Sequence, residues 1–143
     1  MSRVSIAEFE QIARERVPFM GQLGVKVEQL DEGSARIRVP FRDDFIRPGG
    51  TIAGPVLMGL ADLAMYGAVL SLIGPVELAV TTNLNINFLR RPSPGDVIAE
   101  ARILKLGKRL AVGEVGLFRD GEDELVAHVT TTYSIPPRQD TER

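Results

Sequence analysis

Residues 53–73 read AGPVLMGLADLAMYGAVLSLI, and the expected architecture is built around this segment. Pro55 favours a helix start there, because its missing N–H would have no partner in the first turn of a helix. From Val56 to about Ile73 the expected helix is apolar on nearly every side, so in a soluble protein other elements must enclose it. Asp62 and several glycines interrupt the run and make it a poor membrane span, so we expect no membrane association.

Four segments of strand character follow this helix. Short connections rich in Gly, Pro and Asp separate them, which predicts an antiparallel meander. The segments are Leu78–Leu89, Asp96–Leu106, Arg109–Arg119 and Glu124–Ile135.

Two further elements precede the helix. Residues 1–17 hold apolar side chains at helical spacing and predict a short amphipathic N-terminal helix. Residues 25–28 and 35–40 alternate apolar with polar side chains and predict a β-hairpin. We therefore expect one α+β domain over residues 1–143, with a curved antiparallel sheet wrapped around one long central apolar helix. The polar residues 136–143 are expected to form a flexible tail.

The composition bears on several classes of protein and site. A hydrophobic content of 44% in 143 residues is enough for one core, and a net charge of −2 argues against a nucleic-acid partner. The absence of cysteine removes disulfides and thiolate nucleophiles, so we expect a cytoplasmic protein. The N-terminus becomes polar too early for an export signal. His128 is the single histidine, so we expect it to be structural and predict neither a metal nor a redox cofactor.

Asp62 is the residue of the helix that most needs an explanation. A carboxylate between Leu60, Leu63 and Met65 is costly to bury unless it is paired or functional. In the structural interpretation it faces water or caps a neighbouring backbone. In the functional interpretation it is catalytic, because a desolvated carboxylate can attack a thioester or activate water against it.

Gly54 supplies a complementary group at the start of the helix. A backbone N–H there has no partner within the helix and carries the positive end of the helix dipole, so it can bind a developing oxyanion. A plain helix-entry glycine is the alternative. Eight residues separate Gly54 from Asp62, which is about 12 Å along a helix and too far for both to touch one thioester. If both act, they belong to different subunits of a symmetric dimer.

A set of short motifs runs through the chain. They are Leu23-Gly24-Val25, Gly54 with Leu60-Ala61-Asp62, Asn85-Ile86-Asn87-Phe88-Leu89-Arg90, Pro92 with Gly95-Asp96, Gly107-Lys108 and Ala127. Through these motifs the chain resembles the hot-dog-fold acyl-CoA thioesterases of the phenylacetyl-CoA and hydroxybenzoyl-CoA (PaaI-like) type. The resemblance extends from about Phe19 to Tyr133.

The resemblance implies a function and a site. In that family a helix carboxylate attacks the thioester or activates water, a backbone N–H eight residues earlier polarises the carbonyl, and the two groups come from different subunits. Carried onto this chain, the resemblance implies hydrolysis of acyl-CoA to free acid and CoA, with Asp62 and Gly54 as catalytic groups. It also implies a homo-oligomer, either a dimer or a dimer of dimers. Coenzyme A is then part of the substrate, and no cofactor is expected.

The chain departs from the family pattern at the start of the helix. Ala53-Gly54-Pro55 stands where the family commonly has His-Gly-Gly. The loop before the helix also lacks the family's Asn or Gln, and we expect Arg47 or Thr51 to take its place.

Polar residues on the first strand after the helix are further candidates. Alternation places Thr81, Asn83, Asn85 and Asn87 on one face and Thr82, Leu84, Ile86 and Phe88 on the core face. A residue matching Thr81 in the family helps to hold the water or the carboxylate, which gives Thr81 a catalytic role here. Asn83 and Asn85 either contact substrate or bridge the seam between subunits. A Thr that merely favours strand structure is the alternative at position 81.

Other residues could bind the rest of an acyl-CoA. Tyr66 lies one helical turn after Asp62 on the same face, so it either lines the acyl pocket or hydrogen-bonds the Asp62 carboxylate. Packing in the core is the alternative. Coenzyme A carries phosphates, which four basic side chains in loops could contact; the alternative is that they are only solvated charges at strand ends. The four side chains are Arg90, Arg91, Lys108 and Arg109.

Two other functions are open on the sequence alone. A non-catalytic acyl-CoA-binding module would explain the missing polar groups near the helix start. A hydratase or dehydratase of acyl thioesters is the second alternative, although such enzymes need a histidine that is missing there.

Overall fold

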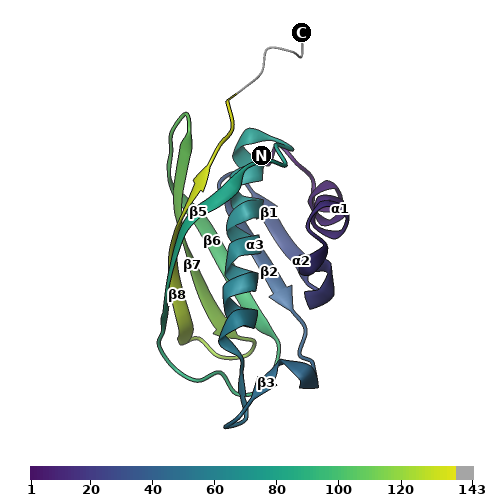
Figure 1. Cartoon of the computed structure of the whole chain (residues 1–143), viewed down its shortest axis with the longest axis vertical. Coiled ribbons are helices and arrows are strands. Elements are labelled where there is room, and N and C mark those ends of the chain that lie inside the picture. The colour runs from purple at the N-terminus through teal and green to yellow at the C-terminus, as the bar shows by residue number, and fades with distance from the viewer. Residues whose placement is uncertain (138–143) are drawn as a thin grey trace.

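The structure, a computed structural model, describes residues 1–137 and is built around one helix. This helix, α3 (Gly54–Ile73), has Ala53 as its N-cap and ends at Gly74. A curved six-stranded antiparallel sheet wraps around it (Figure 1). Helix and sheet thus give the α+β hot-dog fold expected from the sequence. Most of the expected tail at 136–143 lies outside the described residues, because the structure describes the chain only as far as residue 137.

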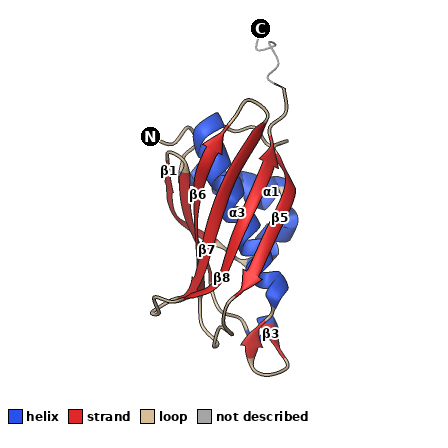
Figure 2. Ribbon diagram, turned by 90° about the vertical axis from the view of Figure 1, so that its left-hand side faces the viewer, coloured by secondary structure: helices blue, strands red, loops and turns tan. Residues whose placement is uncertain are grey.

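The sheet has the order β1-β2-β6-β7-β8-β5 (Figure 2). Its strands are β1 (Lys26–Asp31), β2 (Ser34–Val39), β5 (Val80–Phe88), β6 (Val97–Leu106), β7 (Leu110–Arg119) and β8 (Leu125–Ser134). The expected hairpin is β1–β2, and β6, β7 and β8 form a meander. The prediction that β5 joins this meander was wrong, because β5 pairs with β8 and lies at the edge of the sheet. The chain from β5 to β6 therefore crosses to the far side of the meander.

Two N-terminal helices cover the part of α3 that the sheet leaves open (Figure 1). Helix α1 (Ile6–Arg16) begins with a capping box between Ser5 and Glu8. Helix α2 (Pro18–Leu23), which the sequence analysis did not predict, follows at once. Glycines of α3 allow close packing: a Cβ at Gly67 would lie 3.1 Å from the Phe9 ring. The two helices are therefore held against α3 by contacts that a larger side chain would disturb.

A small hairpin precedes α3 at the far end of the molecule (Figure 1). A 3₁₀ turn at Asp43–Phe45 leads into β3 (Ile46–Arg47), which pairs with β4 (Thr51–Ile52). The N–H of Ala53 donates to the carbonyl of Phe45 at 2.8 Å. This bond holds Ala53, the N-cap of α3, in place.

The core lies between α3 and the concave face of the sheet. Leu57, Leu60 and Met65 are fully buried there. The helix approaches the sheet so closely that a Cβ at Gly113 would lie 2.7 Å from the sulfur of Met65. By length and composition α3 could cross a membrane, but 72% of its most apolar window is buried inside the protein. A core helix of a soluble protein passes the same test.

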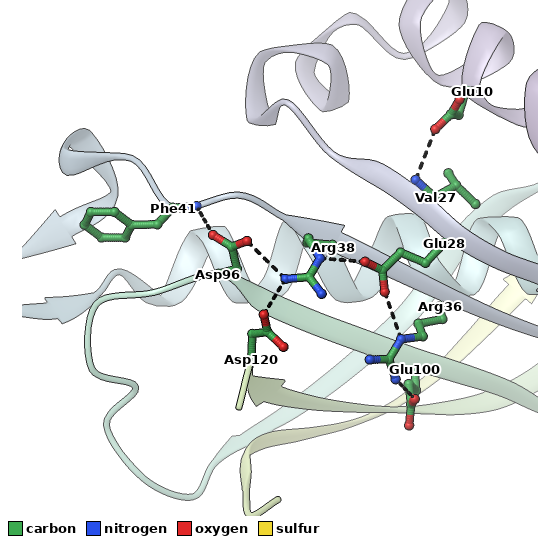
Figure 3. A network of polar contacts seen from close by, with 9 residues as sticks. All are labelled: Glu10, Val27, Glu28, Arg36, Arg38, Phe41, Asp96, Glu100 and Asp120. Carbon is green, nitrogen blue, oxygen red and sulfur yellow. Dashed lines mark hydrogen bonds and ion pairs between the residues drawn. The ribbon is translucent and has the colours of Figure 1, made fainter. Parts of the chain in front are cut away.

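A network of charges ties the outer face of β1, β2 and β6 together (Figure 3). Arg38 bonds Glu28 at 2.6 Å, Asp120 at 2.8 Å and Asp96 at 3.0 Å. The Arg38 guanidinium lowers the pKa of Glu28 and of Asp120, so both carboxylates stay ionised. The other oxygen of Asp96 accepts from the Phe41 N–H. The network thus joins the start of β6 and the β7–β8 loop to β2, on the face opposite α3.

Candidate active site

Asp62 lies half-buried in the middle of α3. Its Oδ1 accepts a hydrogen bond from the Thr81 hydroxyl at 2.6 Å and lies 3.1 Å from the Tyr133 hydroxyl. The same Tyr133 hydroxyl is 3.0 Å from the backbone carbonyl of Asp62. Among residues 1–137, Oδ2 has no hydrogen-bond donor, so one oxygen of the carboxylate is held and the other is free of protein donors.

Two paired strands bring these hydroxyls to the helix. Thr81 at the start of β5 pairs with Tyr133 near the end of β8. A register shift between Thr81 and Asn83 inserts one residue into β5, and a bulge of this kind reverses the alternation of faces. The expectation that Thr81 shares a face with Asn83 and Asn85 was therefore wrong. Thr81 faces the helix, on the same side as the half-buried Leu84 and Ile86.

Tyr133 is a site residue that the sequence analysis missed. It is only 3% exposed. Burial and the neighbouring Asp62 raise the pKa of the phenol, so Tyr133 stays protonated and acts as a hydrogen-bond donor. It lies 71 residues from Asp62 along the chain. No local pattern could have joined the two, although the alternation of β8 would place Tyr133 on the inner face with Val129.

A cavity of about 290 Å³ opens beside the carboxylate. Its lining residues are Val17, Met20, Asp62, Leu63, Tyr66, Glu77, Leu78, Ala79, Val80 and Tyr133. Tyr66 is thus part of the wall, as one of the interpretations expected. The alternative of a hydrogen bond to Asp62 was wrong, because the Tyr66 hydroxyl donates to the carbonyl of Glu77 at 3.0 Å. The Tyr66 ring stacks on Tyr133 with centroids 6.1 Å apart.

Gly54 is the first residue of α3, two helical turns before Asp62. Within the described chain its N–H has no acceptor. A Cβ at this position would lie 3.2 Å from the ring of Phe88, the last residue of β5. Gly54 and Asp62 are therefore next to opposite ends of the same edge strand, Asp62 at Thr81 and Gly54 at Phe88.

The remaining candidates do not gather around Asp62 within one chain. Arg47 and Thr51 pair across β3–β4, near the start of α3. The exposed Arg90 and Arg91 follow β5 at that end, where Arg90 lies 3.5 Å from Glu122 and from Glu124.

Lys108 and Arg109 occupy the β6–β7 hairpin at the opposite end of the sheet (Figure 1). There Arg109 Nε donates to the carbonyl of Ile135. Asn83 and Asn85 are exposed on β5, their side chains 3.4 Å apart.

His128 lies on β8, away from Asp62. Its Nε2 is 3.0 Å from Glu114 Oε1, and Arg102 also bonds Glu114. These two partners, His128 first, lower the pKa of Glu114. No group of three or more metal-ligating side chains occurs in residues 1–137.

The two hydroxyl donors predict a measurable effect on turnover. Thr81→Val and Tyr133→Phe should each lower kcat about tenfold or more in any reaction in which Asp62 takes part. Each hydroxyl orients the carboxylate, and a hydrogen bond to a charged group is worth about 1.5–3 kcal/mol. Thr82→Val is the matched control, since the Thr82 hydroxyl bonds the carbonyl of Thr132 and not Asp62. Equal kcat values for Thr81→Val and Thr82→Val would contradict the role of Thr81.

Comparisons with known proteins agree on one family. Residues 49–126 match the model of the thioesterase superfamily. A crystal structure of a "putative thioesterase" from Silicibacter sp. TM1040 is similar, with a TM-score of 0.85 and 38% identity over 96% of this chain and 95% of that one.

A mutant of the phenylacetic acid degradation protein PaaI from Thermus thermophilus has a TM-score of 0.74 and 33% identity, covering 83% of this chain and 99% of that one. A "Putative esterase" of Saccharolobus solfataricus is 30% identical over 92% of this chain and 86% of its own.

Proposed function

Because the chain belongs to the thioesterase superfamily, a family of thioester hydrolases, we propose that it hydrolyses acyl-CoA to a free acid and CoA, with Asp62 as the reactive carboxylate. One arrangement supports this function above all: Thr81 and Tyr133 hold one oxygen of Asp62 beside an apolar cavity. Because Oδ1 is held, the orientation of the carboxylate is fixed and its second oxygen is free to act on a substrate. The cavity beside it has room for an acyl group.

The reaction needs only water besides the thioester. In one route a water molecule attacks the carbonyl carbon while Asp62 takes a proton from that water. In the other route Asp62 attacks the carbonyl carbon itself and gives an anhydride, which water then hydrolyses. The C–S bond breaks, and the CoA thiolate leaves with its electron pair and takes up a proton. During the attack the carbonyl oxygen becomes negative and needs a donor such as the N–H of Gly54.

The position of β5 supports a site shared between two subunits. It is an edge strand with exposed apolar side chains at both ends, Val80 at 57% and Phe88 at 53% exposure. Two identical edges related by a two-fold axis pair antiparallel. Thr81 of one subunit then lies toward Phe88 of the other, which brings Asp62 toward Gly54 of the partner subunit.

The same pairing gathers the basic side chains around each site. Arg109 lies at the Thr81 end of β5, because Leu110 and Val80 both pair with Ser134. Arg90 and Arg91 lie at the other end, which the partner subunit contributes. Each site therefore receives cations from both chains, which suits the phosphates of coenzyme A.

Thiol release from a panel of acyl-CoA thioesters tests the function. The protein should release free CoA from at least one member of the panel, at a rate proportional to enzyme concentration. Binding of acyl-CoA without thiol release would favour the non-catalytic module instead. Addition of water across an enoyl-CoA without loss of the thiol would favour a hydratase.

The shared site predicts that the protein is at least a dimer in solution at micromolar concentration. Asn85→Lys should shift the molecular mass in solution toward that of the monomer and lower activity. It places a positive charge on each of the two β5 edges that pair in the dimer, and these like charges repel. Thr130→Lys is the matched control: it is exposed on β8 and pairs with Asn85, one strand away from the edge. A wild-type monomer with full activity, measured by light scattering and thiol release, would contradict the shared site.

A further inference from the structure

The walls of the cavity beside Asp62 come from several elements of the fold. Asp62, Leu63 and Tyr66 come from α3, Tyr133 comes from β8, and residues 77–80 lead into β5. A further wall is made by Val17 and Met20, where α1 passes into α2. Helices α1 and α2 lie outside residues 49–126, which the family model matches. The family model therefore says nothing about this wall.

The α1–α2 wall is fixed in place from several sides. Met20 is buried, and a Cβ added at Gly59 of α3 would lie 3.8 Å from its terminal methyl group and 3.3 Å from Leu23. Arg16 at the end of α1 bonds the carboxylate of Glu77 at 2.9 Å. The carbonyl of Glu77 in turn accepts from Tyr66. A wall held by packing and by an ion pair limits how far a ligand can extend.

The lining also defines the chemistry of the ligand. Val17, Met20, Leu63 and Ala79 present apolar atoms, and the two tyrosine hydroxyls are bonded to the protein. The ionisable side chains of the lining, other than these phenols, are the carboxylates of Asp62 and Glu77, and Arg16 pairs with the Glu77 carboxylate. The lining itself holds no cation that would pair with an acyl group ending in a carboxylate, so an uncharged acyl group fits this cavity.

We propose that Met20, with Val17, sets the upper length of an uncharged acyl group bound beside Asp62; this inference rests on the thioesterase function proposed above. Met20 touches the acyl chain and not the reacting carbonyl. It therefore determines which chain lengths are hydrolysed and takes no part in the chemical step.

The test is the chain-length profile of kcat/KM over straight-chain saturated acyl-CoA thioesters. Met20→Ala removes three heavy atoms from the wall, so the optimum should move to chains about two or three carbons longer, with kcat/KM for those chains rising about tenfold. Phe19→Ala is the matched control, because Phe19 also belongs to α2 but is exposed and does not line the cavity. Its profile should match the wild type.

A second variant, Val17→Phe, tests the same wall of the cavity if Met20→Ala does not fold. Val17 is only half-buried, and Val17→Phe fills space at the cavity. It should shorten the optimum and lower kcat/KM for the longest accepted chains about tenfold, while the shortest chains are hydrolysed as before.

The outcomes separate this inference from the function on which it rests. Wild-type thiol release with a profile that neither folded variant moves relative to Phe19→Ala overturns the role of Met20 and leaves the thioesterase standing. Hydrolysis of an acyl-CoA with a terminal carboxylate at the rate of its uncharged analogue overturns the preference for uncharged acyl groups. Absence of thiol release by the wild-type protein from every acyl-CoA overturns both proposals.

Discussion

Replacing Asp62 by Asn should lower the rate of acyl-CoA hydrolysis about a thousandfold or more, because the variant keeps the shape of the side chain but neither attacks a carbonyl nor accepts a proton from water. The Thr81 and Tyr133 hydroxyls can still donate to the amide oxygen, so the surrounding structure has no reason to change. Removing a half-buried charge should leave the free energy of unfolding unchanged or raise it.

Thiol release and thermal unfolding of the same sample check this expectation together. Asp123→Asn, an exposed acid in the β7–β8 loop, controls for the loss of one surface charge. Turnover of Asp62→Asn and Asp62→Ala at the wild-type rate would show that Asp62 is not the reactive group. Loss of activity with a lowered unfolding temperature would instead assign Asp62 a structural role.

Two inactive chains should restore activity when mixed. A chain with Asp62→Ala keeps Gly54, and a chain with Gly54→Val keeps Asp62. Valine obstructs the approach to the backbone N–H without removing it. Its Cβ would lie 3.2 Å from the Phe88 ring, so that ring must shift by a few tenths of an ångström. In a mixed dimer one site receives both wild-type groups and the other site receives both defects.

The expected recovery follows from random exchange. About half of the dimers are mixed and each has one working site of two, so activity should return to about a quarter of the wild-type value. Each parent must first be shown to be folded and inactive. If a native mass measurement shows that the chains exchange and the mixture stays as inactive as its parents, the two groups do not meet across the dimer.

The elements of the fold could be predicted because their signals are local. The apolar run around Leu57–Leu70 has no polar face, and the β1–β2 hairpin alternates strictly apart from its register shift. Helix α2 escaped prediction because six residues are too few to display a helical period. The position of β5 beside β8 escaped because the choice of a strand partner is made between segments far apart in the chain.

The site was predictable in part for the same reason. Asp62 stands out in the sequence because a carboxylate in an apolar helix is costly without a partner. Its partners do not stand out: Tyr133 comes from another strand, and the side on which Thr81 lies depends on one inserted residue after it. A bulge leaves no clear mark in a run of Thr and Asn, so alternation alone assigned Thr81 to the wrong face.

We expect a thioester to bind between Asp62 of one subunit and Gly54 of its partner. A crystal structure of the Asp62→Asn variant with a bound acyl-CoA would show both contacts at once. The carbonyl carbon should lie within about 3.5 Å of the residue 62 side chain, and the carbonyl oxygen within about 3 Å of the Gly54 N–H of the partner subunit. A thioester carbonyl bound away from residue 62, or one that meets no Gly54 N–H from the second chain, would contradict this expectation.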